Sequence, residues 1–254
     1  MSRCPVRPTY GAVLAVALAV ACGEDNPLRH VTFGFSAAGY LRDPSGPPVV
    51  HTRLGWDVTL ASAQVSIGPI YLHNTAPMVG TDMEQGRVVA EVLDTFTVDV
   101  LNPTPEVIPI GGNGTTEPVL SAEVRMAEAV DGPIAIAAGP GVAVAHFAGV
   151  ATRAGVSIQF DGTLTLPMDS GAGAYAAFID HIVSNIPFSF TAGQGGTLTL
   201  RVDPTHWFDF VDFGSLGPVG TPVQSFASPA AQAEVTPGIV SSNAVYLFSW
   251  TPGA

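Results

Sequence analysis

The chain consists largely of short segments in which apolar and polar residues alternate. This period of two is typical of β-strands with one buried and one solvent-facing side. We expect strands within residues 31–35, 58–67, 96–100, 142–147, 158–166, 188–190, 198–202 and 246–250. Turn signals rich in Gly and Pro separate them, at residues 43–48, 111–114, 139–141, 171–173 and 193–196. About nine to eleven short strands at this spacing predict an all-β fold, an antiparallel β-sandwich with few short helical turns.

Helical patterns are sparse. Residues 174–186 hold one helical signal, which ends at Pro187, and residues 225–235 hold another, which Pro229 interrupts. Proline removes a backbone donor and breaks a helix interior, so we expect no more than a turn or two in each segment. No glycine-rich phosphate loop and no internal repeat accompanies them. The sequence pattern therefore favours no other fold class over the β-sandwich.

The first 21 residues are predicted to be a lipoprotein signal peptide. Arg3 and Arg7 supply a short positive region, and an apolar run over residues 11–21 follows. This run is too short to cross a hydrocarbon core of about 30 Å as a helix, but it fits the apolar part of an export signal. The residues before Cys22 resemble a bacterial lipobox, although Ala19 stands where that pattern prefers Leu. We therefore predict lipidation of Cys22.

The mature chain then divides into a tether, residues 22–30, and a single β-sandwich domain, residues 31–254. Cys4 is lost with the signal peptide and Cys22 carries the lipid, so stability must come from a hydrophobic core without disulfides. Gly23 follows the cysteine, and by resemblance to bacterial sorting rules a residue other than Asp there permits passage to the outer membrane. We expect an exported protein, anchored through its lipid in the outer membrane and facing the periplasm or the cell surface.

The charge balance excludes some partners. All nine basic residues are Arg, there is no Lys, and 21 acidic residues give a formal net charge of -12. Removal of Arg3 and Arg7 leaves seven Arg against the same 21 acids, a net charge of -14. A nucleic-acid-binding protein needs a basic surface that displaces counterions, and this chain has none. We predict no nucleic-acid partner, whereas cations remain compatible with the charge.

Sequence motifs for catalysis are weak. The chain has no Gly-x-Ser-x-Gly elbow, and lipidation of Cys22 leaves no thiol nucleophile. Asp209 and Asp212 are a carboxylate pair in sequence, but glycosidase pairing is a property of space rather than of spacing. We predict that the protein is not an enzyme, with a carbohydrate-acting enzyme that uses Asp209 or Asp212 as the remaining alternative.

Metal binding is the chemistry that local clusters favour most. One cluster runs from His51 to Trp56, and a second runs from His73 to Met78. Imidazole and thioether ligands suit copper, and methionine sulfur favours the cuprous state. We expect no other cofactor. The structural alternative is that these residues pack or lie in ordinary loops, since nothing here has the specificity of a histidine-rich metalloprotease motif.

A third cluster combines acids and aromatic rings over residues 203–213. Asp203, His206, Asp209 and Asp212 recur every third residue, so a 3₁₀ turn would place them on one face, where carboxylates could bind a hard cation. The alternative is structural. Its aromatic residues would then plug the end of the sandwich, and its aspartates would cap turns and face water. These aromatic residues are Trp207, Phe208, Phe210 and Phe213.

Several stretches resemble exported lipoproteins of GC-rich bacteria and, more distantly, the MbnP-like periplasmic copper-binding proteins. They are residues 55–60, 65–72, 149–155, 160–164, 196–203, 207–208 and 211–213. Related copper proteins use two His and an oxidised Trp, a set that His51, His73 and Trp56 match loosely. The distant family often carries Cys motifs that this chain lacks, so the resemblance bears on the fold more than on the metal. Met78 or Trp56 would assist the two imidazoles.

Two functions therefore follow from the sequence. The first is a non-enzymatic, lipid-anchored envelope protein that binds a ligand, with copper as the candidate. The second is a structural or protein-interaction lipoprotein of the envelope without a small ligand, which docks an envelope protein through strand edges or through an aromatic loop such as residues 207–213. Convergence of the imidazoles in space would favour the first function.

Overall fold

The computed structural model describes residues 29–40, 48–75, 86–126, 142–166, 180–189, 195–217, 222–240 and 245–253. Its strands are β1 (His30–Gly39), β2 (Val49–His51), β3 (Asp57–His73), β4 (Val88–Val92), β5 (Phe96–Asp99), β6 (Glu106–Thr115), β7 (Pro118–Met126), β8 (Val142–Arg153), β9 (Val156–Leu166), β10 (Asp180–Ser189), β11 (Gly196–Val202), β12 (Gln224–Ser225) and β13 (Tyr246–Pro252). Two 3₁₀ turns, η1 (Pro204–His206) and η2 (Phe213–Ser215), and one helix, α2 (Pro229–Val240), complete these ranges. The predicted all-β, sandwich-like fold is confirmed.

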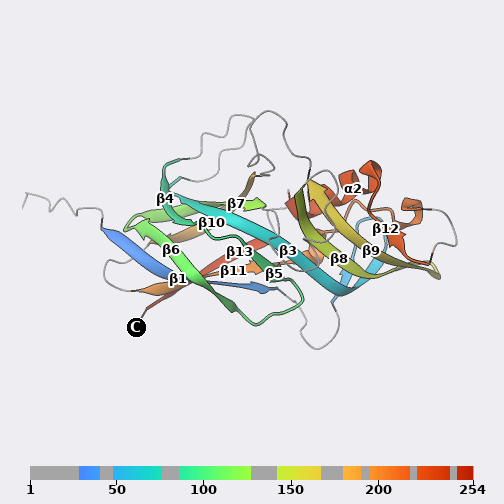
Figure 1. Ribbon diagram of the computed structural model, residues 1–254, viewed down its shortest axis with the longest axis horizontal. Coiled ribbons are helices and arrows are strands. Elements are labelled where there is room, and N and C mark those ends of the chain that lie inside the picture. The colour runs from blue at the N-terminus through green and yellow to red at the C-terminus, as the bar shows by residue number, and fades with distance from the viewer. Residues whose placement is uncertain are drawn as a thin grey trace, which may run out of the picture.

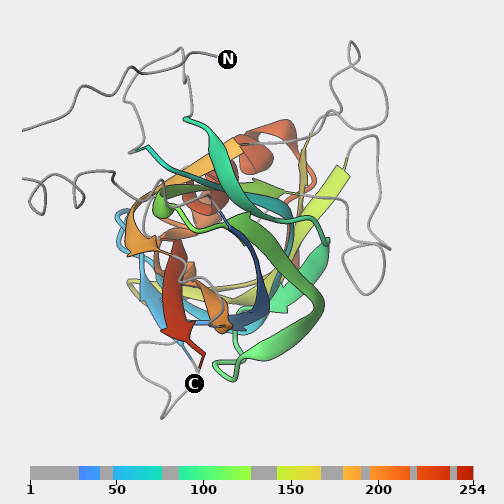
Figure 2. The same ribbon diagram turned by 90° about the vertical axis from the view of Figure 1, so that its left-hand side faces the viewer.

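The 17-residue strand β3 organises the sheet. Along one side it pairs first with β8 and then with β7, and along the other side with β2, β5 and β4 in turn. The sheet continues from β4 through β6, β1 and β11 to β13. β13 comes to lie next to β10, which pairs with β7, so this part of the sheet curls back on itself (Figure 2). In Figure 1 the other end of the molecule carries β8, β9, β12 and α2.

The pairing is not purely antiparallel. β1 pairs with β11 in parallel, and β12 pairs with β9 in parallel, while every other pair of described strands is antiparallel. β1 lies between β6 and β11, and β6 runs antiparallel to it. A return from β1 to a parallel neighbour requires a long connection, which the intervening strands provide. Local alternation cannot reveal such a distant partner.

The core is one continuous cluster of buried apolar side chains. Towards the β8–β9 end it is aromatic: the ring of Phe147 lies 5.2 Å from that of Phe208 and 4.9 Å from that of Phe226. Near the middle, Phe35 contacts Phe96 with ring centroids 5.3 Å apart. Burial of large rings supplies much of the hydrophobic stabilisation, so the described part of the chain is held together without a covalent link.

One predicted turn is a strand. Residues 111–114 lie inside β6, because Gly112 and Gly114 are places of close packing rather than of chain reversal. A Cβ atom on Gly112 would lie 2.2 Å from the ring of Phe33, and one on Gly114 would lie 2.6 Å from the Cβ of Ala90. Glycine in a strand marks such close approaches as well as turns.

The predicted helical segments are also corrected. Residues 180–186 belong to β10, and residues 174–179 lie outside the described ranges. α2 begins at Pro229 rather than being interrupted by it, since proline is well suited to the first position of a helix, and it continues past Pro237. Within the described ranges no helix has the length and apolar character needed to cross a lipid bilayer.

Candidate interaction site

The structure separates the two histidines that were expected to share a metal. His51 is the last residue of β2, paired with Asp57 at the start of β3, whereas His73 ends β3. A strand of this length extends on the order of 50 Å, so one ion cannot contact both imidazoles of one molecule. Met78 and Cys22 lie outside the described residues. The structure therefore does not bring His51 and His73 of one molecule together.

Four of the described imidazoles, those of His51, His73, His146 and His206, have a carboxylate neighbour instead. His51 is exposed, and its Nδ1 lies 2.6 Å from Asp57 Oδ1. His146 Nε2 lies 3.1 Å from Asp161 Oδ1, and both belong to the β8–β9 pair. No group of three His, Cys, Asp or Glu side chains that could hold a metal ion occurs among the residues that the structure describes.

His73 is buried beside Glu123. Its Nδ1–H donates to the Gly86 carbonyl at 2.8 Å, and its Nε2 lies 3.5 Å from Glu123 Oε2, beyond good hydrogen-bond geometry. Burial is the largest single influence and lowers the pKa of His73, but the carboxylate of Glu123 and the Gly86 carbonyl together raise that pKa above its ordinary value. Arg125 forms an ion pair with Glu123 and opposes the rise. The cluster is a buried charge network rather than an open site.

The first and third sequence clusters meet at the end of the molecule where β2, β8 and β9 lie (Figure 1). Arg53 Nε lies 3.1 Å from Asp209 Oδ2, and the Trp56 indole N–H donates to Asp212 Oδ1 at 3.3 Å. Trp56 also packs edge-on against Phe213, with ring centroids 5.6 Å apart. We call this region the tip, defined by Arg53, Leu54, Trp56, Arg153, Asp209, Phe210 and Asp212.

A tight turn presents Arg53 and Leu54. The Thr52 N–H donates to the Trp56 carbonyl at 2.9 Å, and the Trp56 N–H donates to Thr52 Oγ1 at 3.1 Å. Gly55 has φ 77°, a left-handed conformation that glycine adopts without strain. The turn therefore holds two exposed residues at a fixed position beside Trp56.

The opposite side of the tip is built from the two 3₁₀ turns. Asp203 caps η1 by accepting from the Thr205 N–H at 2.8 Å, and Asp212 caps η2 by accepting from the Gly214 N–H at 3.2 Å. The Asp212 N–H in turn donates to Glu234 Oε2 of α2 at 3.1 Å. The predicted capping role is confirmed for these two aspartates, which belong to two separate turns rather than to one face.

The aromatic residues of this segment divide into two groups. Trp207, Phe208 and Phe213 are fully buried and plug the end of the core, as predicted, whereas Phe210 is 47% exposed. Asp203 and Asp209 are buried, so they do not face water as expected. Burial of Asp209 is compatible with its charge because it accepts from His206 Nδ1 at 2.9 Å and pairs with Arg53.

Two guanidinium groups lie on aromatic rings at the tip. Arg53 lies 5.4 Å from the Phe210 ring centroid, and Arg153 lies 4.1 Å from the Trp56 ring centroid. Arg153 also donates to the Leu54 carbonyl at 3.0 Å and to Asp212 Oδ1 at 3.3 Å. Each cation is thus held by a ring and a carboxylate, which fixes the direction of its remaining N–H donors.

Arg53 retains capacity to bind. Its side chain is 69% exposed, and only Nε is engaged, by Asp209. No other hydrogen-bonding partner of its guanidinium occurs within the described residues, so the outer N–H donors face solvent. Leu54, 43% exposed, lies next to it in the turn, and Val156 follows the Arg153 hairpin turn. The tip can therefore accept a carboxylate and bury apolar side chains around it.

The sequence pattern identified Trp56 and the acidic segment of residues 203–213 as separate clusters, but it did not predict that they contact each other. The hydrogen bond between Trp56 and Asp212 spans 156 positions along the chain, and no local pattern reports it. One signal was present: Arg53 and Arg153 both precede a turn glycine by two residues, in a chain with nine Arg and no Lys. Comparisons with protein families, with curated proteins and with solved structures find no match for this chain.

Proposed function

We propose that the chain is a non-enzymatic, lipid-anchored protein of the cell envelope that binds a protein partner through the tip. This is the second of the two functions expected from the sequence. The observation that carries it is the convergence of Arg53 and Arg153, each stacked on a ring and paired with an aspartate, beside the exposed Leu54 and Phe210. Arginine and aromatic residues are enriched where proteins bind each other tightly.

The chemistry of the tip indicates a partner that presents a carboxylate next to apolar side chains. A guanidinium recognises a carboxylate through paired N–H donors, and Leu54 and Phe210 would lose exposed apolar area on contact. The chain has a formal net charge of -12, so an acidic partner is repelled over most of the surface. Arg53 and Arg153 provide local positive charge on this otherwise acidic chain, so a carboxylate of the partner would bind at the tip.

The proposed anchor is compatible with this role. In Figure 1, β1 begins at the end of the molecule opposite β2, β8 and β9. β1 starts at His30, a few residues after the proposed lipidation site Cys22. A lipid at Cys22 would therefore attach the chain to the membrane from the end remote from the tip, and would leave the tip accessible to a partner in the periplasm or at the cell surface.

Photocrosslinking in the native envelope tests the proposal. A photoreactive amino acid placed at Leu54 or at Phe210 is expected to give one discrete adduct of the same partner. The matched control is Leu93, which is 56% exposed between β4 and β5. The additional change Arg53→Gln should strongly reduce the adduct from Leu54. Adducts of equal yield at all three positions, or an adduct that survives Arg53→Gln unchanged, would contradict the assignment of the tip.

The anchor is tested separately. Cys22→Ser is expected to release the protein from the membrane fraction and to leave its thermal unfolding unchanged, because residue 22 precedes β1. Membrane attachment that persists in Cys22→Ser would reject lipidation without affecting the interaction proposal, since the two rest on different residues.

A further inference from the structure

The first half of β6 has a free edge. β6 pairs with β1 along its length, from Glu106 to Thr115, but on its other side it pairs with β4 only at Asn113 and Gly114. On the side facing away from β1, residues 106–112 therefore present backbone N–H and C=O groups that no described strand pairs with. An unpaired strand edge is a template for another extended chain. Pro109, which lacks an N–H, fits a strand edge.

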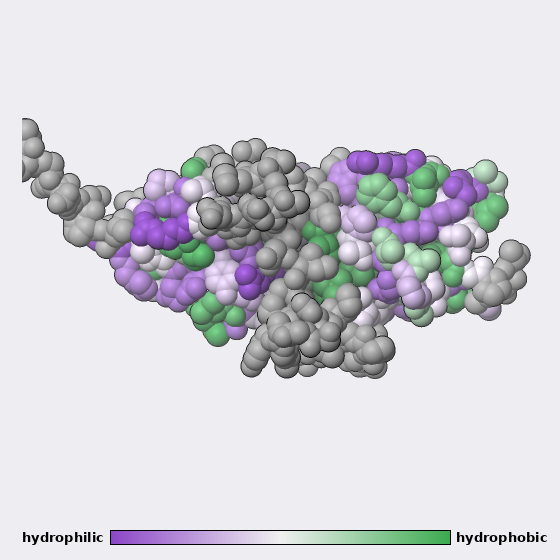
Figure 3. All heavy atoms as spheres, turned by 90° about the horizontal axis from the view of Figure 1, so that it is seen from above, coloured by the Kyte–Doolittle hydropathy of each residue, from purple (hydrophilic) through white to green (hydrophobic). Residues whose placement is uncertain are grey.

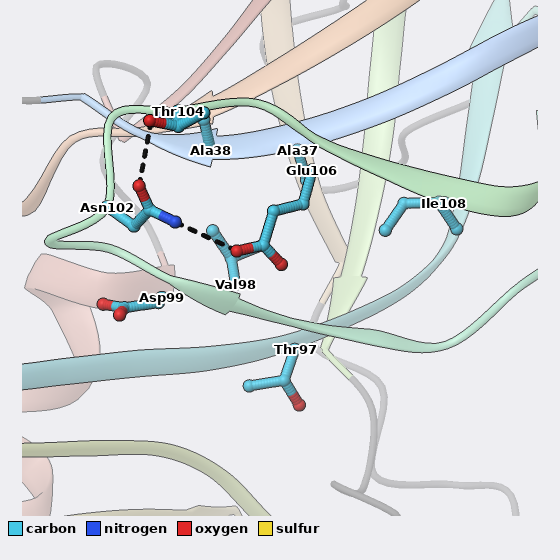
Figure 4. A pocket seen from close by; sticks show the side chains of 9 residues that line it. All are labelled: Ala37, Ala38, Thr97, Val98, Asp99, Asn102, Thr104, Glu106 and Ile108. Atoms are coloured by element: carbon cyan, nitrogen blue, oxygen red, sulfur yellow. Dashed lines mark hydrogen bonds between the residues drawn. The ribbon is translucent and has the colours of Figure 1, made fainter.

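The side chains of this segment are unusually exposed. Val107 is 77% exposed and Ile110 is 69% exposed, the highest values of any large apolar residue in the described part of the chain. Figure 4 shows Glu106 and Ile108 on the other side of the strand, pointing into a notch beside Thr97 and Asp99 of β5. The inward residues are thus accounted for by contacts within the protein, while Val107 and Ile110 have no such role.

A bulge directs Ile110 outward. Ile108 is opposite Phe35 and Gly112 is opposite Phe33, so residues 109–111 face Gly34 alone. Gly111 has φ 67°, and a Cβ there would lie 2.5 Å from the Phe33 carbonyl oxygen. The extra residues bend the strand. This bend lies along the free edge, where it changes the direction of one large apolar side chain.

An open groove of about 340 Å³ lies beside the bulge. Its lining includes Phe33, Ile108, Ile110 and a row of glycines from β1, β6 and β11, at positions 34, 111, 112 and 196. The rings of Phe33 and Trp250 cover Gly112 and Gly196, so the apolar lining of the groove comes from Phe33, Ile108 and Ile110. Figure 3 shows hydrophobic and hydrophilic residues interspersed over the described surface of one face of the molecule.

We propose that the edge of β6 at residues 106–112 binds an extended segment of a partner protein by strand addition. Backbone hydrogen bonds would supply affinity, and the groove would select an apolar side chain. The segment should be basic, because the chain has a formal net charge of -12. The same charge opposes pairing of β6 with a second copy. This site is separate from the tip.

The test uses the mature protein and a synthetic peptide of alternating Val and Thr with Lys at both ends. Saturable binding is expected, together with slower hydrogen exchange of the amides in residues 106–112. Changing Val107 and Ile110 together to Thr should weaken binding by at least about tenfold, since apolar contacts are lost while strand propensity is retained. Leu93→Thr is the matched exposed control and should leave binding within about twofold.

Two further probes define the binding mode. A peptide with Glu in place of Lys should bind more weakly, and a peptide N-methylated at alternate residues should not bind, because it cannot complete the backbone ladder. Phe210→Ala should have no effect, which separates this site from the tip. The proposal is overturned by absence of saturable binding, by equal binding of the N-methylated peptide, or by a concentration-dependent dimer that protects the same amides.

Discussion

At the scale of single residues, Asp209 connects two distant parts of the chain. It is a buried carboxylate with two cationic or potentially cationic neighbours, Arg53 at 3.1 Å and His206 at 2.9 Å. The aspartate spacing of residues 203–212 was visible in the sequence, whereas its partner in the β2–β3 turn was not. Spacing reports neighbours along one element, but an ion pair between elements depends on the fold that brings them together.

We expect Asp209→Asn to destabilise the protein by about 1–3 kcal/mol, because a buried hydrogen-bonded charge pair loses its carboxylate. Urea unfolding measures this change. Asp57→Asn is the matched control: Asp57 also contacts a histidine, His51, but its side chain is 58% exposed. An exposed pair contributes less than about 1 kcal/mol, so equal losses in the two variants would contradict a structural role of the buried pair.

A second residue-scale prediction concerns His73 and pH. The folded-state pKa of His73 is raised, so its protonated form is favoured by folding. This contribution to the free energy of unfolding is fully present below the unfolded pKa of about 6.5 and is lost as pH rises through the folded pKa. The difference in stability between the wild type and His73→Gln should therefore shrink as pH rises.

Urea unfolding of both proteins from about pH 5.5 to about pH 9 measures this difference. Glu123→Gln removes the carboxylate that faces His73 Nε2 at 3.5 Å, so that variant should lose the same pH-dependent contribution. A difference between the wild type and His73→Gln that stays constant over the range would show that the imidazole does not gain its proton on folding.

At the scale of elements, alternation predicted the strands whose two faces differ in environment. β8 and β11 follow this rule and were expected within residues 142–147 and 198–202. β6 was not predicted, because residues 106–111 are largely exposed and its glycines resemble a turn. β2 was not predicted because it has only three residues, too few to show the alternation of apolar and polar positions.

The β8–β9 hairpin offers a test of backbone conformation alone. Ala154 and Gly155 form its two-residue turn with φ 50° and 82°, the left-handed values of a type I′ turn. Nothing lies within 4 Å of a Cβ added at Gly155. Gly155→Ala should therefore cost roughly 1 kcal/mol through the backbone alone, and Ala154→Asn should stabilise by up to about 1 kcal/mol.

Thermal unfolding measures the expected loss of stability in Gly155→Ala and the expected gain in Ala154→Asn. The steric comparison is Gly162→Ala in β9, where a Cβ would lie 2.6 Å from the ring of Phe226. That variant should lose more stability than Gly155→Ala, since a core side chain must move. A larger loss for Gly155→Ala would show that the turn is held by contacts other than its own dihedral angles.

At the scale of the whole molecule, the length of β3 determines which side chains can contribute to the same binding site. The sequence correctly indicated an all-β fold, but it could not place the histidine side chains relative to one another. His51 and Trp56 lie near the start of β3, whereas His73 lies at its far end. Any copper bound by His51 is therefore bound independently of His73.

Copper titration of the metal-free mature protein followed by calorimetry tests this independence. If His51→Ala and His73→Ala each reduce binding, the two reductions should add in the double variant, because sites separated by much more than about 10 Å with no common partner do not couple. His73 should contribute little below its raised pKa, since a protonated imidazole cannot bind a metal. A single tight site that either substitution abolishes would require His51 and His73 to meet, and only contact between two molecules could bring them together.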